Sequence, residues 1–575
     1  MERGIGTSRG IGIGHVLVVS NNNAVVNRGT HYNANEEKAR FFEARKIFME
    51  QTESLLTDLE KKLGESDKDA LVLKNQIYLV KDITTENEVV AAIENNNICA
   101  EAAFEDVCNK LIKLFSSMDN SDMQQRVTDI QDMKERMIQI LQGEKAFDLT
   151  NLPDNTVIVA DEIKPSMTAS MDIAHVAGIV AEKGGDTAHA SILARALEIP
   201  AVLSVKGILQ KVKNGDSIII DGAYGEVFIN PTQRTFSIYE KKKKKYEEHI
   251  EELKTFINKS TETADGKKVM LAANIGGAEE AAKAVKAGAE GVGLFRTEFL
   301  FLNKSALPTE EEQFEEYKKA AVLTKGMPLT IRTLDIGGDK DIPYMGLTKE
   351  TNPFLGYRAI RFCLDRVDIF TTQLRAILRA SAYGSIRIMI PMITSVNEIR
   401  QVKELIKKIC SNLERNGISY DKNIHIGVMI ETPAAAVMAD VIAQEVDFFS
   451  IGTNDLTQYT IAVDRCNENV AYLYSAFNPA VLRLIRRIIE CAHNAGIEAG
   501  MCGEAAANAL MAPILLSFGL DEFSVSTGKV LETRKTIADW SLKEAGLVTD
   551  KVMSMATEKE VTDYLSDYLS ERNKK

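Results

Sequence analysis

A histidine that follows a glycine-rich turn is well placed for chemistry in this sequence. His189 comes shortly after Gly184 and Gly185, where a helix is expected to begin. The positive end of a helix dipole disfavours the imidazolium form, so the ring is held there as a neutral nucleophile. Once the ring carries a phosphoryl group, the N–H groups at the helix end stabilise its negative charge. The segment predicts a phosphorylated histidine, although a histidine at a helix start is more commonly a capping or packing residue.

Two acidic residues, Glu431 and Asp455, lie at the ends of two successive strand-like runs in the C-terminal half of the chain. If these runs are neighbouring parallel strands, both carboxylates lie at the same edge and can converge. Two carboxylates, completed by substrate oxygens and water, make an octahedral oxygen site that suits Mg²⁺. The pair therefore predicts a magnesium site.

Three arginines lie close to other ends of these runs, namely Arg296, Arg332 and Arg465. A guanidinium group is permanently charged and binds phosphate or carboxylate through two parallel hydrogen bonds. Any one of these residues could equally form a structural salt bridge. Their joint placement on one rim favours a site for a small polyanion that is bound through Mg²⁺.

Cys502 lies at the end of the seventh strand-like run and is the remaining reactive side chain of this group. A thiol beside a metal and arginines can act as an acid or a nucleophile, and the alternative is a small apolar core residue. The seven cysteines are scattered and include no Cys-x-x-Cys pair. This pattern favours reduced thiols in a cytosolic enzyme over a disulfide or zinc framework.

The C-terminal half contains eight strand-like runs that alternate with helical stretches. Such an alternation predicts a (β/α)₈ barrel, whose chemistry lies at the carboxyl ends of its strands. The alternative is an open, doubly wound sheet. The runs are 269–275, 291–298, 329–336, 386–393, 425–432, 448–454, 498–503 and 522–525.

The N-terminal half changes its hydrophobic period near residue 155. Residues from about 33 to 145 have helical spacing and few glycines, whereas short β runs follow from there to about residue 230. A strand near His15 would complete the small α/β domain and make the helical domain an insertion. The predicted division is an α/β domain (1–20 and 146–230), a helical domain (21–145), a linker helix (231–260) and a barrel domain (261–575).

The composition restricts the function classes. The 575 residues carry a formal net charge of −13, which argues against a general nucleic-acid binder. No run of about 18 apolar residues occurs, and the N-terminus lacks the apolar core of a signal peptide. We therefore expect a cytoplasmic protein with no membrane insertion.

Two segments resemble the signatures of the enzymes that use phosphoenolpyruvate (PEP). Residues 184–195 resemble the phosphohistidine signature, and residues 447–465 resemble the second, longer signature. Residues 291–298, 335–340 and 501–504 add to the similarity. Over almost the whole chain, the sequence is similar to the Enzyme I group of the bacterial phosphotransferase system (PTS).

This resemblance implies a phosphotransferase of the first step of sugar uptake, with His189 as the residue phosphorylated by PEP and Cys502 as the acid that protonates the leaving enolate to pyruvate. The phosphoryl group would pass to the carrier protein HPr, docked on the helical domain. Thr168 would orient the His189 ring, and the barrel would form a homodimer. Glu431 and Asp455 would hold Mg²⁺, and PEP would be bound by Arg296, Arg332, Lys340, Asn454, Asp455 and Arg465.

The sequence departs from the family pattern beside the histidine. Position 186 is Asp, which places a carboxylate near a residue that must receive a dianion, and Ala188 replaces the usual Ser. Every chemical role remains filled, so we expect activity to persist.

Two other functions compete with this interpretation. A dikinase or PEP synthase would need an ATP-binding domain, but the residues before 155 are mostly helical and hold no glycine-rich nucleotide loop. A non-catalytic or regulatory paralogue would have lost the histidine, a metal carboxylate or the arginines, and none is lost.

Overall fold

The computed structural model describes residues 1–19, 26, 28–29, 32–63, 68–116, 121–143, 149–185, 189–302, 304, 306–337, 342–347 and 350–572. The chain divides into two compact units, residues 1–249 and 250–575. No helix in these described ranges combines the length and hydrophobicity that a membrane span requires.

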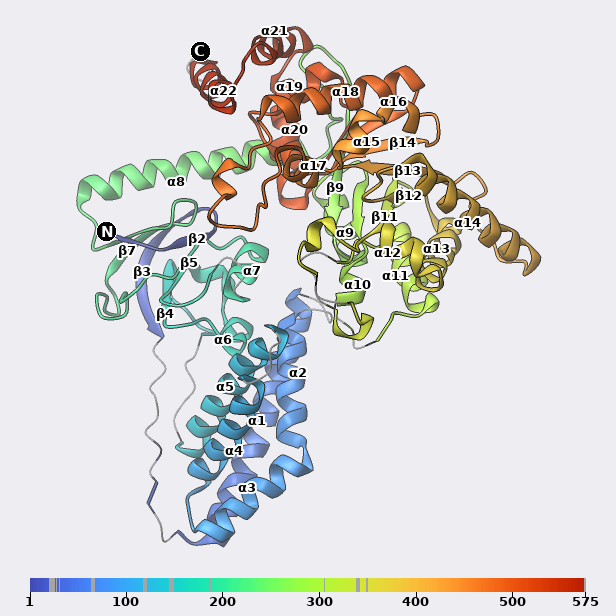
Figure 1. The fold of residues 1–575 in the computed structure, drawn as a ribbon. Helices are drawn as coiled ribbons and strands as arrows, with labels where there is room; N and C mark the ends of the chain where they lie inside the picture. The colour runs from blue at the N-terminus through green and yellow to red at the C-terminus, as the bar shows by residue number, and fades with distance from the viewer. Residues whose placement is uncertain are drawn as a thin grey trace. The chain divides into compact units, whose positions relative to one another are not determined.

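An eight-stranded mixed sheet forms the centre of the first unit (Figure 1). Strand β3 (Ile11–Val19) pairs in parallel with β4 (Thr156–Ala160), although more than a hundred residues separate them. The helical segment is therefore an insertion between two adjacent strands, as the sequence predicts. The other strands are β1 (Glu2–Arg3), β2 (Ile5–Ser8), β5 (Val176–Ala181), β6 (Ala201–Leu203), β7 (Ser217–Asp221) and β8 (Glu226–Ile229).

The insertion folds as a helical bundle with its own core. Phe41, Phe48, Phe104, Met133 and Met137 are buried there, at the helical spacing that the sequence shows. Its helices are α1 (Ala34–Leu63), α2 (Lys68–Lys81), α3 (Ile83–Asn96), α4 (Ala100–Ser116) and α5 (Ser121–Leu141). The short α6 (Pro165–Ser170) packs Ala169 against α1 and α2, so the bundle and the sheet share a small apolar cluster.

Helix α8 (Gln233–Lys254) connects the two units and is attached to the first at its start. The Tyr239 hydroxyl donates a 2.7 Å hydrogen bond to Glu226, and the Lys242 ammonium lies over the Tyr239 ring. Just after the helix, the carbonyl groups of Phe256 and Ile257 accept hydrogen bonds from Arg534 of the second unit. Each end of the connection is thus held by polar contacts within its own unit.

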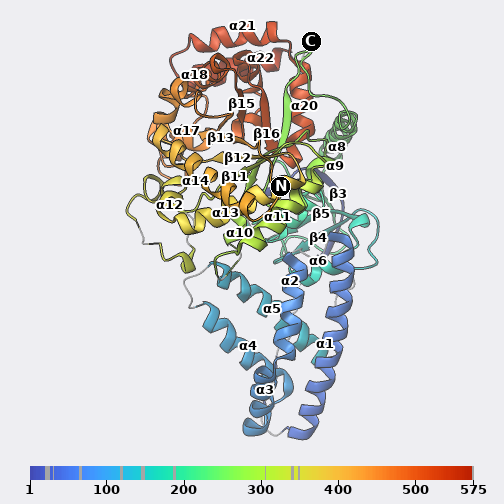
Figure 2. The same cartoon turned by 90° about the vertical axis from the view of Figure 1, so that its right-hand side faces the viewer.

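Eight parallel strands close into a barrel in the second unit, so the predicted barrel is confirmed and the open-sheet alternative is wrong. In Figure 2 these strands lie inside a layer of helices. The strands are β9 (Met270–Ile275), β10 (Val292–Arg296), β11 (Leu329–Arg332), β12 (Ile386–Ile390), β13 (His425–Ile430), β14 (Phe448–Ile451), β15 (Glu498–Met501) and β16 (Glu522–Ser526).

The helices of the second unit cover the outside of the barrel and extend beyond it. They are α9 (Ala278–Lys286), α10 (Phe299–Leu302), α11 (Glu310–Leu323), α12 (Ile360–Asp365), α13 (Val367–Ala380), α14 (Val396–Arg415), α15 (Pro433–Val437), α16 (Ala439–Ile442), α17 (Thr453–Ile461), α18 (Pro479–Ala495), α19 (Ala512–Phe518), α20 (Val530–Asp539), α21 (Leu542–Met553) and α22 (Glu558–Arg572). A large core lies between strands and helices, and a separate cluster that includes Leu294, Met389, Met429 and Phe448 fills the barrel interior.

The amino-terminal end of the barrel contains a titratable group, Glu522, at the start of β16. Burial raises the pKa of Glu522 to about 7, and the nearby carboxylates of Glu498 and Asp521 add to the rise, whereas Arg387 opposes it. The folded state therefore binds more protons than the unfolded state between about pH 4.5 and 7. Stability should fall as the pH rises through that window.

We expect Glu522→Gln to remove this pH-dependent loss of stability, because the glutamine amide cannot ionise. The variant should exceed the parent in free energy of unfolding by about 2–3 kcal/mol at pH 8, and by progressively less as the pH is lowered toward 5. Denaturant unfolding of both proteins across this range measures the difference. A difference that does not change with pH would contradict the prediction.

Candidate active site

Glu431 and Asp455 follow adjacent strands of the barrel, Glu431 directly after β13 and Asp455 in the first turn of α17, which follows β14. Ile430 of β13 and Ile451 of β14 are paired in register, so the residues after them lie side by side at the carboxyl rim. Glu431 accepts a 2.7 Å hydrogen bond from the Met392 backbone N–H. A Cβ atom at Gly452 would lie 2.8 Å from Glu431 Oε2, so the glycine leaves room for the carboxylate.

The electrostatics of this carboxylate pair are unfavourable without a cation. Burial raises the pKa of Glu431 to about 8, and the charges of Asp455 and Asp335 add to the rise. The Oδ1 atom of Asp455 is buried and accepts no hydrogen bond among the described residues, although Arg465 Nη1 lies 3.1 Å away. Two buried anionic oxygen donors fit a hard divalent cation such as Mg²⁺.

The chain itself supplies only part of such a metal site. Within the described ranges, no three His, Cys, Asp or Glu side chains are arranged to hold a metal ion. Oxygen atoms of substrate and water would have to complete the coordination, and the Mg²⁺ site stays a prediction.

Arg296 and Arg332 are neighbours at the ends of β10 and β11, where they are paired in register. Arg332 is buried, contacts Glu298 through Nη2 and lies 3.1 Å from Asp335 through Nη1. Arg296 is exposed to solvent. The rim therefore offers one guanidinium that is fixed by carboxylates and one beside it that is open to an incoming anion.

A further arginine, Arg358, was missed by the sequence analysis and connects the two sides of the rim. Its Nη2 atom donates to both oxygens of Asp335 at 2.9 and 3.0 Å, and to Asp455 Oδ2 at 3.3 Å. Its Nη1 atom donates to the Tyr459 hydroxyl at 3.3 Å. Arg358 lies in the long loop between β11 and α12, far from a strand end, so strand-end reasoning could not find it.

We expect Arg358→Lys to slow the phosphorylation by PEP that the sequence resemblance implies by about 10–100-fold, the usual cost of losing a partner that orients a metal ligand, the role predicted for Asp455. A lysine cannot reproduce the bidentate contact with Asp335 while it also reaches Asp455. Rapid-quench phosphorylation measures the effect, and Arg375→Lys, which changes a guanidinium paired with Glu310, is the control. Equal effects of the two substitutions would contradict the prediction.

Cys502 lies inside the barrel mouth, directly after β15. The thiol is buried, which raises its pKa to about 11 and keeps it protonated. Its backbone N–H donates to the Ile451 carbonyl at 3.2 Å, which joins the ends of β14 and β15. A thiol that stays protonated in this way is able to donate its proton.

Asn454 precedes Asp455 in the first turn of α17, and Arg465 lies in the loop after that helix. The Asn454 amide donates to Glu504 at 3.4 Å and accepts from the Glu504 backbone N–H at 3.3 Å. Arg465 makes the ion pair with Asp455, and its backbone N–H donates to Gln458 at 3.2 Å. The structure thus brings together six predicted residues at one end of the barrel, which are Arg332, Glu431, Asn454, Asp455, Arg465 and Cys502, with Arg296 beside them.

Two predicted residues fall outside this description. Lys340 lies outside the described residues. His189 is the first residue of α7 (His189–Ala196), as expected, but its side chain also lies outside them, as do Asp186 and Ala188. The turn before it is held by Ser191, which donates to the Gly185 carbonyl at 2.6 Å, and by Ser204, which donates to Gly184. Thr168 is buried in α6.

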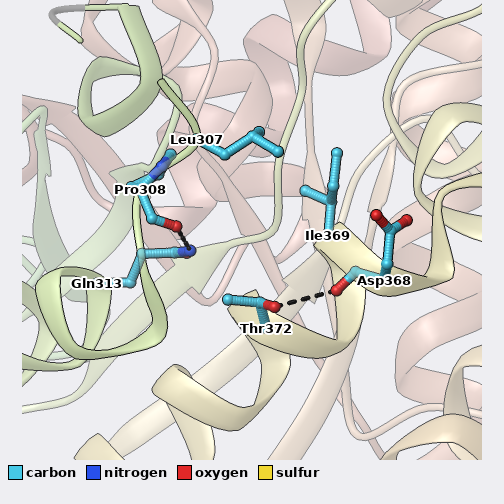
Figure 3. A pocket seen from close by; sticks show the side chains of 6 residues that line it. All are labelled: Leu307, Pro308, Gln313, Asp368, Ile369 and Thr372. Carbon is cyan, nitrogen blue, oxygen red and sulfur yellow. Dashed lines mark hydrogen bonds between the residues drawn. The ribbon is translucent and has the colours of Figure 1, made fainter. Parts of the chain in front are cut away.

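A small cavity between α11 and α13 lies apart from these residues (Figure 3). Leu307, Pro308 and Ile369 give it apolar walls, and its polar groups bond to the backbone: Gln313 donates to the Pro308 carbonyl and Thr372 to the Asp368 carbonyl. It contains none of the predicted site residues and has no assigned role.

Comparison with known proteins finds similarity along most of the chain. Three family models match: the N-terminal domain of PEP-utilising enzymes (residues 3–126), their mobile domain (152–225) and their PEP-binding domain (250–542).

Curated relatives match over almost their full length. A phosphoenolpyruvate-protein phosphotransferase of Priestia megaterium is 42% identical over 98% of both chains. Proteins of the same name from Geobacillus stearothermophilus and Bacillus subtilis are 43% and 41% identical, over 98% of this chain and 97% and 99% of theirs. The chain therefore belongs to the family of PEP-utilising enzymes, among the phosphoenolpyruvate-protein phosphotransferases.

Proposed function

We propose that this protein takes the phosphoryl group of PEP onto His189 and passes it to a histidine of the carrier HPr, releasing pyruvate as the first step of PTS sugar uptake. The observation that carries the proposal is the convergence of Glu431, Asp455 and the buried guanidinium of Arg332 at one barrel rim. This rim offers what a small polyanion and a divalent cation need together.

PEP is bound at this rim by its phosphate and carboxylate groups. Arg296, Arg332 and Arg465 supply the positive charge, and Asn454, Asp455 and Lys340 complete the set. Glu431 and Asp455 would hold Mg²⁺, whose positive charge would offset that of the phosphate during its transfer. Arg358 and Asp335 orient Asp455 and Arg332 through their ion pairs.

The phosphoryl transfer is an in-line displacement that depends on positioning and charge neutralisation. The His189 nitrogen forms a bond to phosphorus as the P–O bond to the enol oxygen breaks, and enolpyruvate leaves. Cys502 then gives its proton to C3 while the enolate becomes the ketone. Pyruvate departs, and water returns a proton to the thiolate. Thr168 orients the histidine ring.

The donor and acceptor residues belong to different units, so the first unit must approach the barrel to be phosphorylated. Helix α8 connects the units and supplies the linker for that motion. HPr then docks on the helical domain, within residues 21–145. Exposed apolar side chains on α2 and at the start of α3 suit a protein partner, since Tyr78 and Ile83 are 72% and 70% exposed.

We retain the predicted domain boundaries for this function: residues 1–20 and 146–230 carry the phosphohistidine, 231–260 form the linker, and 261–575 bind PEP and form the homodimer. The protein acts in the cytoplasm. The competing functions, a nucleotide-dependent PEP enzyme and a non-catalytic regulator, make different predictions for nucleotide use and phosphotransfer.

The decisive experiment compares phosphotransfer to purified HPr with nucleotide-dependent activity. Labelled PEP and Mg²⁺ should carry label through this protein to HPr without any nucleotide. Transfer that requires AMP or ATP would favour the first competing function, and an absence of any phosphoprotein would favour the second.

A further inference from the structure

The side chain of Ser450 faces the same part of the barrel interior as Cys502. Ser450 of β14 is paired in register with Gly500 of β15, two residues before Cys502. Side chains two residues apart on a strand point to the same face. A Cβ atom added at Gly500 would lie 3.1 Å from the Cβ atom of Glu522. Cys502 and Phe448 both belong to the cluster of buried residues that fills the barrel interior. Both polar groups therefore point inward.

The Ser450 hydroxyl has no evident structural use. The residue is only 3% exposed, and its Oγ atom has no hydrogen-bond partner of ordinary geometry within the described part of the chain. Burial of an unsatisfied hydroxyl is unfavourable, so alanine would be the more stable choice if packing were the sole requirement. The strand register places this hydroxyl on the same interior face as Cys502. Burial raises the pKa of the Cys502 thiol, and the Ser450 hydroxyl opposes that rise.

The backbone of Cys502 is fixed from the other side by Asn274 of β9. The Asn274 amide donates to the carbonyl of Cys502 at 3.0 Å and to that of Ser524 at 3.3 Å. Its own oxygen accepts a 2.7 Å hydrogen bond from the fully buried hydroxyl of Ser524. The Asn274 amide thus links the end of β9 to Cys502, the first residue after β15.

The Cys502 thiol is only weakly hydrogen-bonded. Its one hydrogen bond of ordinary geometry within the described ranges goes to the Ile451 carbonyl, at 3.9 Å. A thiol is a poor donor, so this bond alone would let the S–H group rotate. Among the described residues, the Ser450 hydroxyl lies on the same interior face, has no other hydrogen-bond partner and can restrict that rotation.

We infer that Ser450 and Asn274 are positioning residues that aim the Cys502 thiol at one face of enolpyruvate, an inference that rests on the proposed function. In the step, the S–H bond breaks and a C–H bond forms at C3 with the electron pair of the enolate. The enolate C–O bond becomes the ketone. The Ser450 hydroxyl donates to the thiolate that remains, until a proton from water restores the thiol.

The test follows the stereochemistry of protonation, which a merely structural residue would not control. The probe is the Z isomer of the 3-methyl analogue of PEP, turned over in D₂O, with the 2-oxobutyrate product trapped by a dehydrogenase. The parent should place deuterium on one face of C3. Ser450→Ala should give a mixture of both configurations, because enolate that is not protonated in the site reacts with water on either face.

The same substitution should also separate the kinetic constants. With PEP, kcat for pyruvate formation should fall about tenfold, the factor for one hydrogen bond to a charged group, while KM changes less than about twofold. Ser450→Thr retains the hydroxyl and should restore stereospecificity. Asn274→Ala should also yield a mixture, and if that variant does not fold, the Ser450 series decides.

Two controls keep the outcomes separate. Thr533→Val removes another buried hydroxyl, in α20, that has no hydrogen-bond partner among the described residues, and it should leave both readouts unchanged. Ser450→Ala should unfold at the same temperature as the parent or higher. Retained stereospecificity and rate in Ser450→Ala would overturn the inference. A parent that PEP does not phosphorylate would instead reject the proposed function, and a stereospecific Cys502→Ala would reject Cys502 as the acid.

Discussion

Replacement of His189 by alanine should abolish labelling of this protein by PEP and Mg²⁺. The loss should exceed about 10³-fold, because removal of a nucleophile leaves only binding and charge stabilisation, neither of which can hold the phosphoryl group. The phosphate on the parent should be lost in acid and retained in base, as expected for a P–N bond. Autoradiography after denaturation under both conditions measures the label.

The control for this prediction is a histidine of the same unit. His175 lies directly before β5, and its ring contacts Asp172 and Asp154. His175→Ala should keep full labelling. Both variants should show the parent's unfolding transition. Label that survives His189→Ala would reject the assignment of the phosphorylated residue, whatever the rest of the site does.

The barrel could be predicted from the sequence because each strand is an apolar run with a polar residue after it. The predicted runs extend past the observed strands for the same reason. The run 291–298 continues two residues beyond β10, into Thr297 and Glu298. Thr297 donates to the Arg332 carbonyl, and Glu298 contacts the Arg332 side chain. These buried residues have strand-like patterns, but they belong to the loop that builds the site.

The N-terminal strands show why other elements could not be predicted. The glycine-rich start of the chain gives little hydrophobic periodicity, yet it forms β1, β2 and most of β3. A Cβ atom at Gly14 would overlap the Asn155 carbonyl, and one at Gly6 would overlap the Gly222 carbonyl. The glycines are required by close backbone approach between distant segments, which no local pattern encodes.

The site was predictable to the extent that its residues follow strands. Glu431, Asp455 and Cys502 come within a few residues of a strand end, whereas Arg358 comes 26 residues after Arg332 closes β11. Its role depends on a loop that returns to the rim, and Ala359 beside it has a φ of 51°. The path of such a loop depends on tertiary packing and leaves no periodic pattern in the sequence.

Glu431→Gln should reduce PEP-dependent phosphorylation by at least about 10³-fold while it leaves the barrel folded. The amide keeps the shape of the side chain and removes the negative charge that a divalent cation needs. Because Asp455 and Asp335 lie close enough to repel the Glu431 charge, the neutral variant should unfold in EDTA at the parent's temperature or higher. Rapid-quench labelling and calorimetry measure the two effects.

The same variant should lose its response to the metal. Ligands that bind only the folded state raise the unfolding temperature, so Mg²⁺ together with PEP should stabilise the parent, with an increase that grows with their concentration. That increase should vanish in Glu431→Gln and persist in Glu445→Gln, which changes a carboxylate that pairs with Arg400 before β14, away from the rim. An equal rise in all three proteins would mean that the cation binds elsewhere, and the carboxylate pair would then have a structural role. Loss of activity with a retained metal response would instead assign Glu431 to the orientation of Arg332 and Arg358, whose charges it also feels.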